Sequence, residues 1–124
     1  ERKFLDLPEN GKLIFSSRIL SADNVPIIKE NCFYPMIDRF RFLLETSLEQ
    51  PLFPLLKQNS IIPAVDNKRT LELSTASRET ATQMGIPVGS PMFYRVAHIT
   101  EENGMPLYIE RSYIVGSRYI IYLS

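Results

Sequence analysis

Residues 84–113, MGIPVGSPMFYRVAHITEENGMPLYIERSY, and residues 5–34, LDLPENGKLIFSSRILSADNVPIIKENCFY, follow one plan. Each begins with an apolar residue and a proline, continues through a run of strand length, and reaches a turn rich in Asn, Asp or Gly. After the turn each has a proline and, four residues later, a glutamate: Glu30 in one copy and Glu110 in the other. A spacing of about eighty residues is too long, and two copies are too few, for a solenoid. The sequence therefore predicts a sheet with approximate two-fold internal symmetry.

Each copy has the pattern of a β-hairpin. Asp23-Asn24 and Asn103-Gly104 are pairs that readily adopt the positive φ angles of tight turns. A proline follows each turn near the start of the second strand, where its missing N–H costs no ladder hydrogen bond. We expect the four strands at residues 13–20, 26–33, 92–99 and 106–113.

The stretch between the hairpins has helical character. Apolar residues recur near a 3.6-residue period over 40–48 and again over 52–56. Pro51 and Pro54 are expected to break this stretch into short pieces, because proline lacks the N–H that a helix interior needs.

Further along the chain, a third strand is expected over 69–74, where apolar and polar residues alternate. Ser74 or Thr75 is expected to cap a short helix over 76–84, which Gly85 ends in the left-handed conformation. A last strand is expected over 119–123, which is rich in aromatic and β-branched residues. Helices beside a mostly antiparallel sheet give an α+β fold.

Composition indicates one cytoplasmic domain over residues 1–124. Lys and Arg total 14 and so do Asp and Glu, so there is no net charge to attract nucleic acid or an anionic membrane. The single cysteine, Cys32, cannot form an internal disulfide, and no apolar run approaches the ~20 residues that span a bilayer. The chain opens at Glu1 without an initiator Met, and we expect a further segment before it.

The sequence carries no pattern typical of catalysis or of a metal or cofactor site. One histidine, His98, and one cysteine cannot assemble a Cys/His zinc site, and a Cys–His dyad would require the only copy of each to meet. We interpret Cys32 as a small buried residue and His98 as a residue on the sheet surface. There is no glycine-rich phosphate loop and no G-x-S-x-G motif. We expect a protein that is not an enzyme and uses no cofactor.

Strand alternation groups several ionisable side chains. Arg18 and Glu30 lie on partner strands of the first hairpin, and Arg95 and Glu110 on partner strands of the second, where Tyr108 shares the face of Glu110. These residues either occupy a solvated face and pair across the hairpins, or line a polar pocket. If they line a pocket, Arg18, Glu30, Tyr108 and Glu110 face a common cleft.

The repeated phrase Leu/Ile-Pro-x-Gly, strand, turn, Pro-x-x-x-Glu-x-x-Tyr/Phe resembles the UTRA domain, the effector-binding half of GntR-type bacterial transcription regulators of the HutC branch. The resemblance covers nearly the whole chain. It implies a chorismate-lyase-like sheet, a homodimer, and a small-molecule effector such as a sugar phosphate. It also implies that operator DNA is bound only through a winged helix-turn-helix domain located before this chain.

Carried over by position, Arg18 matches the first arginine of the family's Arg-x-Arg, Glu30 matches the glutamate twelve residues on, and Arg118-Tyr119 match the final Arg-Tyr. Other polar residues of the family pattern are replaced here, at Leu20, Pro51, Phe53, Ala97 and Tyr108. Two of the lost groups are arginines, whose planar fork suits phosphate, so we predict an effector that is not bound mainly through a phosphate. The residues predicted to bind the effector are Arg18, Glu30, Arg95, Tyr108, Glu110, Arg118 and Tyr119.

Two alternatives remain open at this point. A small enzyme of the chorismate-lyase kind would share the fold, because fold does not determine function. A degenerate domain kept only for dimerisation would share it too.

Overall fold

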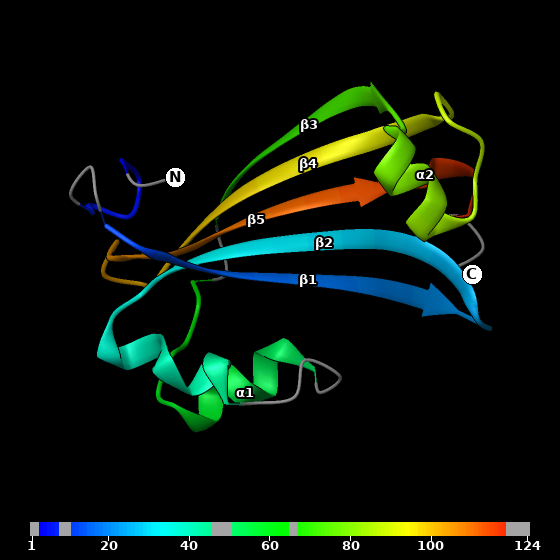
Figure 1. Ribbon diagram of the computed structural model, residues 1–124. Helices are drawn as coiled ribbons and strands as arrows, with labels where there is room; N and C mark the ends of the chain where they lie inside the picture. The colour runs from blue at the N-terminus through cyan, green and yellow to red at the C-terminus, as the bar shows by residue number, and fades with distance from the viewer. Residues whose placement is uncertain (1–2, 8–10, 46–50, 65–66, 119–124) are drawn as a thin grey trace. The chain divides into compact units, whose positions relative to one another are not determined.

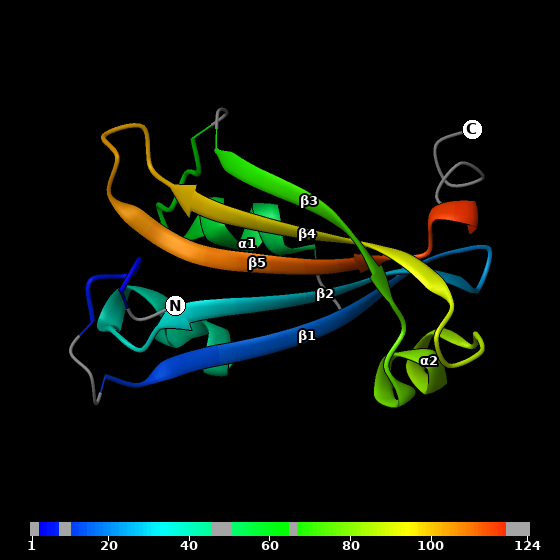
Figure 2. The ribbon, with the colours of Figure 1, turned by 90° about the horizontal axis from the view of Figure 1, so that it is seen from above.

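A computed structural model describes residues 3–7, 11–45, 51–64 and 67–118. It contains a five-stranded antiparallel sheet with the strand order β1-β2-β5-β4-β3, which Figure 2 shows from above. The strands are β1 (Leu13–Ala22), β2 (Val25–Pro35), β3 (Lys68–Thr75), β4 (Pro91–Thr100) and β5 (Pro106–Ile114). The helical elements are the 3-10 helix η1 (Asp38–Leu44) and the α-helices α1 (Leu52–Gln58) and α2 (Arg78–Met84). The predicted α+β class with an antiparallel sheet is confirmed.

The two hairpins form as the turn residues predict. Asp23 and Asn24 have φ angles of 51° and 64°, and Gly104 has a φ of 85°. The second strands of the hairpins, β2 and β5, are neighbours in the sheet. Residues 26–35 and 106–115 have the same order of buried and half-buried positions, residue by residue. The internal repeat read from the sequence is therefore also a repeat of structural environment.

Contacts divide the chain into two compact units, and every hairpin strand contributes to both. The first unit comprises residues 1–16, 32–68 and 97–109. The second unit comprises residues 17–31, 69–96 and 110–124.

The first unit has an aromatic core covered by its own helical segments. Figure 1 shows η1 and α1 on one side of the strands, and they contribute the buried Phe40 and Leu56 to this core. Tyr34 packs between two rings, with centroids 5.6 Å from Phe40 and 5.0 Å from Tyr108. Burial raises the pKa of the Tyr34 hydroxyl, so this phenol stays neutral inside the core.

Two details of the first unit correct the sequence expectations. Pro51 does precede a helix, as the N-cap of α1, but Pro54 lies inside that helix and does not break it. Pro54 occupies the first turn, where a proline removes no intrahelical hydrogen bond. The stretch before α1 forms a 3-10 helix, in which Phe40 and Leu43 are buried three residues apart.

The second unit places α2 on one face of its strands. The cap is Ser77, whose hydroxyl accepts a hydrogen bond of 3.2 Å from the N–H of Thr80. The sequence analysis placed this cap at Ser74 or Thr75, but Thr75 is still part of β3. Gly85 ends α2 with a φ of 65°, as expected. Buried Ala81 and Met84 of α2 then pack against Met92 of β4.

The strand expected over 119–123 lies outside the described residues. Among the helices of the described ranges, none is long and apolar enough to cross a membrane.

Candidate functional site

The candidate site begins with the register of the first hairpin. Ser17 Oγ donates a hydrogen bond of 2.7 Å to Asn31 Oδ1, so these two residues lie opposite each other on one face of the second unit. Successive side chains of a strand point to opposite faces. Arg18 and Glu30 are therefore neighbours on the other face.

A charged pair joins β4 and β5. Arg95 Nη2 lies 3.1 Å from Glu110 Oε1 and 3.4 Å from Ser112 Oγ. The hydroxyl of Ser112 also donates a 3.3 Å hydrogen bond to Glu110 Oε1. The side chains of Arg95 and Glu110 are 30% and 17% exposed, so the pair is partly shielded from water but still reachable.

The glutamates of the two hairpins lie close together. Oxygen atoms of Glu30 and Glu110, the equivalent glutamates of the repeat, lie within 4.8 Å of each other. Arg18, Glu30, Glu110 and Arg95 thus form a line across β1, β2, β5 and β4, which we call the charged row. Two carboxylates this close repel each other, and the Arg95 guanidinium beside Glu110 offsets part of that repulsion.

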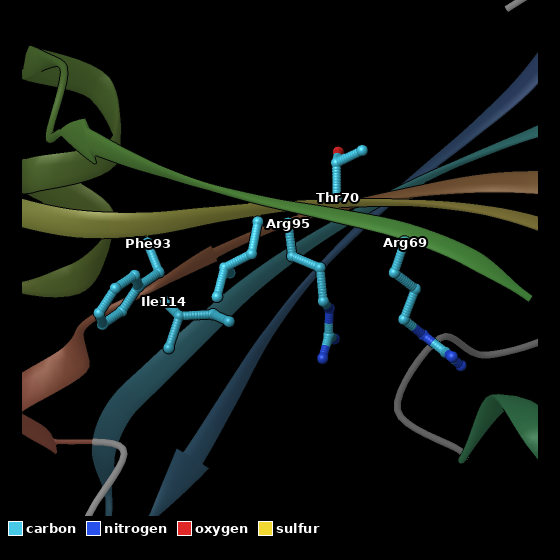
Figure 3. Close-up of a pocket in the computed structure, with 6 residues that line it drawn as sticks. Arg69, Thr70, Phe93, Arg95 and Ile114 are labelled. Carbon is cyan, nitrogen blue, oxygen red and sulfur yellow. The ribbon is translucent and has the colours of Figure 1, made fainter.

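A cavity of about 410 Å³ adjoins the β4 end of the charged row. Figure 3 shows Arg69, Phe93, Arg95 and Ile114 projecting to the same side of the strands, whereas Thr70 points away. The described lining residues are Arg69, Thr70, Leu71, Phe93, Arg95 and Ile114. All of them belong to the second unit.

The Phe93 wall of this cavity depends on a glycine. A Cβ atom added to Gly116 would lie 2.7 Å from a ring carbon of Phe93, closer than such contacts normally come. Because Gly116 has no side chain, the Phe93 ring has room to occupy the position in which it lines the cavity.

Two arginine donors on the charged row are buried and unsatisfied. Arg18 Nη2 and Arg95 Nε have no hydrogen-bond partner in the part of the chain that the structure describes. A buried donor without a partner costs free energy, and such groups are often completed by a ligand or by water.

The sequence of residues 1–120 matches the model of the UTRA domain family. The chain is a UTRA domain. Similar solved structures include the C-terminal domain of Yurk from Bacillus subtilis, with a TM-score of 0.83 and 20% identity, covering 94% of this chain and 80% of that one. The effector domain of PhnF from Mycobacterium smegmatis has a TM-score of 0.79 and 21% identity, covering 94% of this chain and 72% of that one.

A GntR-family transcriptional regulator from Enterococcus faecalis has a TM-score of 0.73 and 22% identity over 95% of this UTRA domain and 84% of that chain. In a longer PhnF structure, the match covers 94% of this chain but only 52% of that chain. Among curated proteins, none matches the sequence. The family and the fold implied by the resemblance are therefore confirmed.

Not every predicted site residue of the UTRA domain reaches the charged row. Arg118 donates hydrogen bonds of 3.0, 2.8 and 3.2 Å to the backbone carbonyls of Pro26, Met84 and Gly85. It thereby fixes the C-terminus of α2 within the second unit. Tyr108 is buried in the aromatic core of the first unit, and Tyr119 lies outside the described residues.

Sequence reasoning missed the part of the cavity supplied by β3 and β5. Arg69 and Leu71 come from β3, and Ile114 is the last residue of β5. The one available signal was the apolar alternation of β3, where Leu71 and Leu73 remain 62% and 82% exposed. A half-buried strand would normally turn those positions toward the core.

The opposite face of the second unit is closed by α2. Buried Lys29 places its Nζ 3.5 Å from Thr80 Oγ1 and 5.8 Å from the centroid of the Tyr113 ring. Tyr94 and Tyr113 stack at 5.0 Å, and burial raises the pKa of the Tyr113 hydroxyl. Because α2 covers this face, the charged row lies on the face that α2 leaves accessible.

Proposed function

We propose that this UTRA domain is the effector-binding and dimerisation domain of a bacterial transcription regulator. The observation that carries the proposal is the charged row, beside a cavity of about 410 Å³ and with two unsatisfied arginine donors. Small-molecule sites typically combine an apolar hollow of 300–1,000 Å³ with a few converging polar groups. Arg18, Glu30, Arg95 and Glu110 are the residues that we assign to the effector.

The regulatory step in this proposal is a population shift. An effector that binds one dimer state more tightly than the other changes the balance between them, and by linkage changes operator affinity by the same coupling free energy. Operator DNA is bound by a separate domain that precedes this one, in the cytoplasm. This chain has 14 basic and 14 acidic residues, and its lack of net charge agrees with DNA binding by the other domain.

We propose that the domain binds its effector without transforming it. The similar PhnF structure is an effector domain, and the similar Enterococcus faecalis structure is a transcriptional regulator. The two residue types best suited to nucleophilic catalysis lie in the first unit, where Cys32 is buried in the core and His98 stacks on Phe4 at 4.4 Å.

We propose a homodimer as the functional state. The strand β3 is an edge of the sheet, and its Leu73 side chain is 82% exposed. An exposed apolar edge strand favours pairing with another chain. Sedimentation at tens of micromolar is expected to give the dimer mass, and Leu73→Lys is expected to weaken it; a wild-type monomer would count against this part of the proposal.

Effector binding is tested by thermal-shift screening of the chain against a broad panel of metabolites, followed by titration calorimetry of any hit. Arg18→Gln should weaken that hit by about tenfold or more, because it removes one charged hydrogen-bond donor from the row. Arg78→Gln, at an exposed position in the first turn of α2, is the matched control and should leave the affinity unchanged. If no metabolite stabilises the wild-type chain, a domain kept only for dimerisation becomes the better description.

A further inference from the structure

We propose that the effector is a small monocarboxylate with an apolar body, held with its carboxylate at Arg95 and its body in the cavity beside Phe93. This inference rests on the proposed effector-binding function and names the ligand class for the same site. It departs from a sugar phosphate in both charge and shape.

The charge of the site fits one negative charge. Arg95 lines the cavity and already shares its charge with Glu110 at 3.1 Å. On the other side of Glu110, Glu30 adds a second carboxylate within 4.8 Å. A phosphate monoester carries about −1.5 to −2 charges at pH 7, and it would meet the Glu110 carboxylate directly beside its anchoring arginine. A carboxylate brings a single charge and needs a single cation.

The donors that remain at Arg95 also fit a carboxylate better than a phosphate. Nη2 of Arg95 is engaged with Glu110 and Ser112, whereas Nε is buried without a partner among the described residues. A phosphate is typically held by several charged donors, often by a bidentate guanidinium fork. Here Nη2 is already occupied by Glu110 and Ser112, so less of the fork is open to a multiply charged anion.

The rest of the cavity is apolar and suits a flat or branched hydrocarbon body. Phe93 is 39% exposed and Leu71 is 62% exposed, so both present surface that a ligand can bury, and Ile114 forms a buried contact behind them. An aromatic ring offers an offset-stacking or edge-on contact to such a body. A polyhydroxylated sugar would bury its hydroxyl groups against these walls without hydrogen-bond partners, which is unfavourable.

The test uses two probes that share an aromatic ring and differ in the anionic group. Phenylacetate and phenyl phosphate are titrated calorimetrically into the full 124-residue chain, with glucosamine 6-phosphate as the sugar phosphate. We expect phenylacetate to bind at least about threefold more tightly than phenyl phosphate, and glucosamine 6-phosphate to bind more weakly than either. Arg95→Gln should weaken phenylacetate about tenfold or more, because a charge-assisted hydrogen bond is lost.

Two further variants separate a binding role from a structural one. Arg78→Gln removes the same charge from an exposed position of α2 and should leave phenylacetate binding unchanged. Glu110→Gln removes the repelling carboxylate, so it should raise the affinity for phenyl phosphate relative to the affinity for phenylacetate. Circular dichroism melts of each variant identify any that fail to fold, and in that case the selectivity of Glu110→Gln still tests the charge argument.

The outcomes distinguish this inference from the proposed function. Tighter binding of glucosamine 6-phosphate than of phenylacetate, lost in Arg95→Gln, would overturn the carboxylate assignment and leave the effector-binding function intact. Failure of phenylacetate to bind, or binding that Arg95→Gln does not change, would also overturn the assignment. The proposed function itself fails only if the broad metabolite screen finds no ligand.

Discussion

The two units use the same four hairpin strands for different purposes. In the first unit, the strand segments bury Tyr34, Leu107 and Tyr108 beneath η1 and α1. In the second unit, the segments of β1, β2, β4 and β5 carry Arg18, Glu30, Arg95 and Glu110 on the face opposite to α2. A repeated hairpin therefore provides a closed core along one part of its length and an accessible charged surface along another. The comparison teaches that stability and binding can be altered separately in this domain.

The largest expected effect is a loss of stability from the first unit. Phe40 is 1% exposed, and Phe40→Ala should lower the free energy of unfolding by about 3–5 kcal/mol, because it removes an aromatic side chain and leaves a cavity. Phe53, in α1, is 61% exposed, and Phe53→Ala should change stability by less than about 0.5 kcal/mol. Urea unfolding measures both. Equal losses in the two variants would contradict the closed-core description.

The sequence was informative where structure depends on local chemistry. Asp23-Asn24 and Gly104 adopt the left-handed conformations that their residue types favour, and the two hairpins follow from them. It was less informative where a residue's partner is distant in the chain. Arg118 looks like a ligand-binding residue by position, but it bonds to Pro26, which is 92 residues away. No local pattern reveals such a contact.

The burial of Tyr108 was equally hard to predict from the sequence. Tyr108 shares its strand face with Glu110, so alternation alone grouped the two. The structure assigns Tyr108 to the first unit and Glu110 to the second. The pattern of a strand predicts the side on which a residue lies, but the elements that cover each part of the strand decide whether that side is core or surface.

The next effect in size tests whether Arg118 is structural in the second unit. Arg118→Ala removes hydrogen bonds to three backbone carbonyls and should lower stability by about 1–3 kcal/mol. Phenylacetate affinity should remain within about twofold of the wild type, as measured by calorimetry below the melting transition. A large loss of affinity with unchanged stability would mean that Arg118 binds the effector directly.

A smaller effect is expected from the ion pair at the edge of the first unit. Arg39 donates to both carboxylate oxygens of Glu101, at 2.5 and 2.7 Å, and this hydrogen bonding lowers the pKa of Glu101. A carboxylate whose pKa is lowered by folding stabilises the fold above its unfolded pKa, near 4.3, and loses that contribution as the pH falls through the lower folded value.

Glu101→Gln should therefore lower the free energy of unfolding by about 1 kcal/mol or less at pH 7. As the solution is acidified, the wild type loses the same contribution. Thermal melts of wild type and variant between pH 7 and pH 3 measure this, and their difference should shrink toward the acid end. A difference that stays constant with pH would mean that the ionised pair is not the source of the stability. Glu102→Gln, at the neighbouring exposed carboxylate, is the control.

The smallest expected effect on stability comes from a substitution in the second unit. That substitution should change ligand affinity more than stability. Gly116 lies where an added Cβ would come within 2.7 Å of the Phe93 ring, and that ring is 39% exposed. The ring can turn away at little cost, so Gly116→Ala should change stability by less than about 0.5 kcal/mol. Moving the ring disturbs one wall of the cavity, so phenylacetate affinity should fall about two- to fivefold.

A double-mutant cycle shows whether the Phe93 ring is the cause. Phe93→Leu removes the ring atoms that the new methyl group would meet, so adding Gly116→Ala to Phe93→Leu should have almost no further effect on affinity. The two substitutions are then non-additive, as expected for residues in direct contact. Additive losses would mean that Gly116 affects the site by another route. The wall of the cavity would then not depend on the space that this glycine leaves.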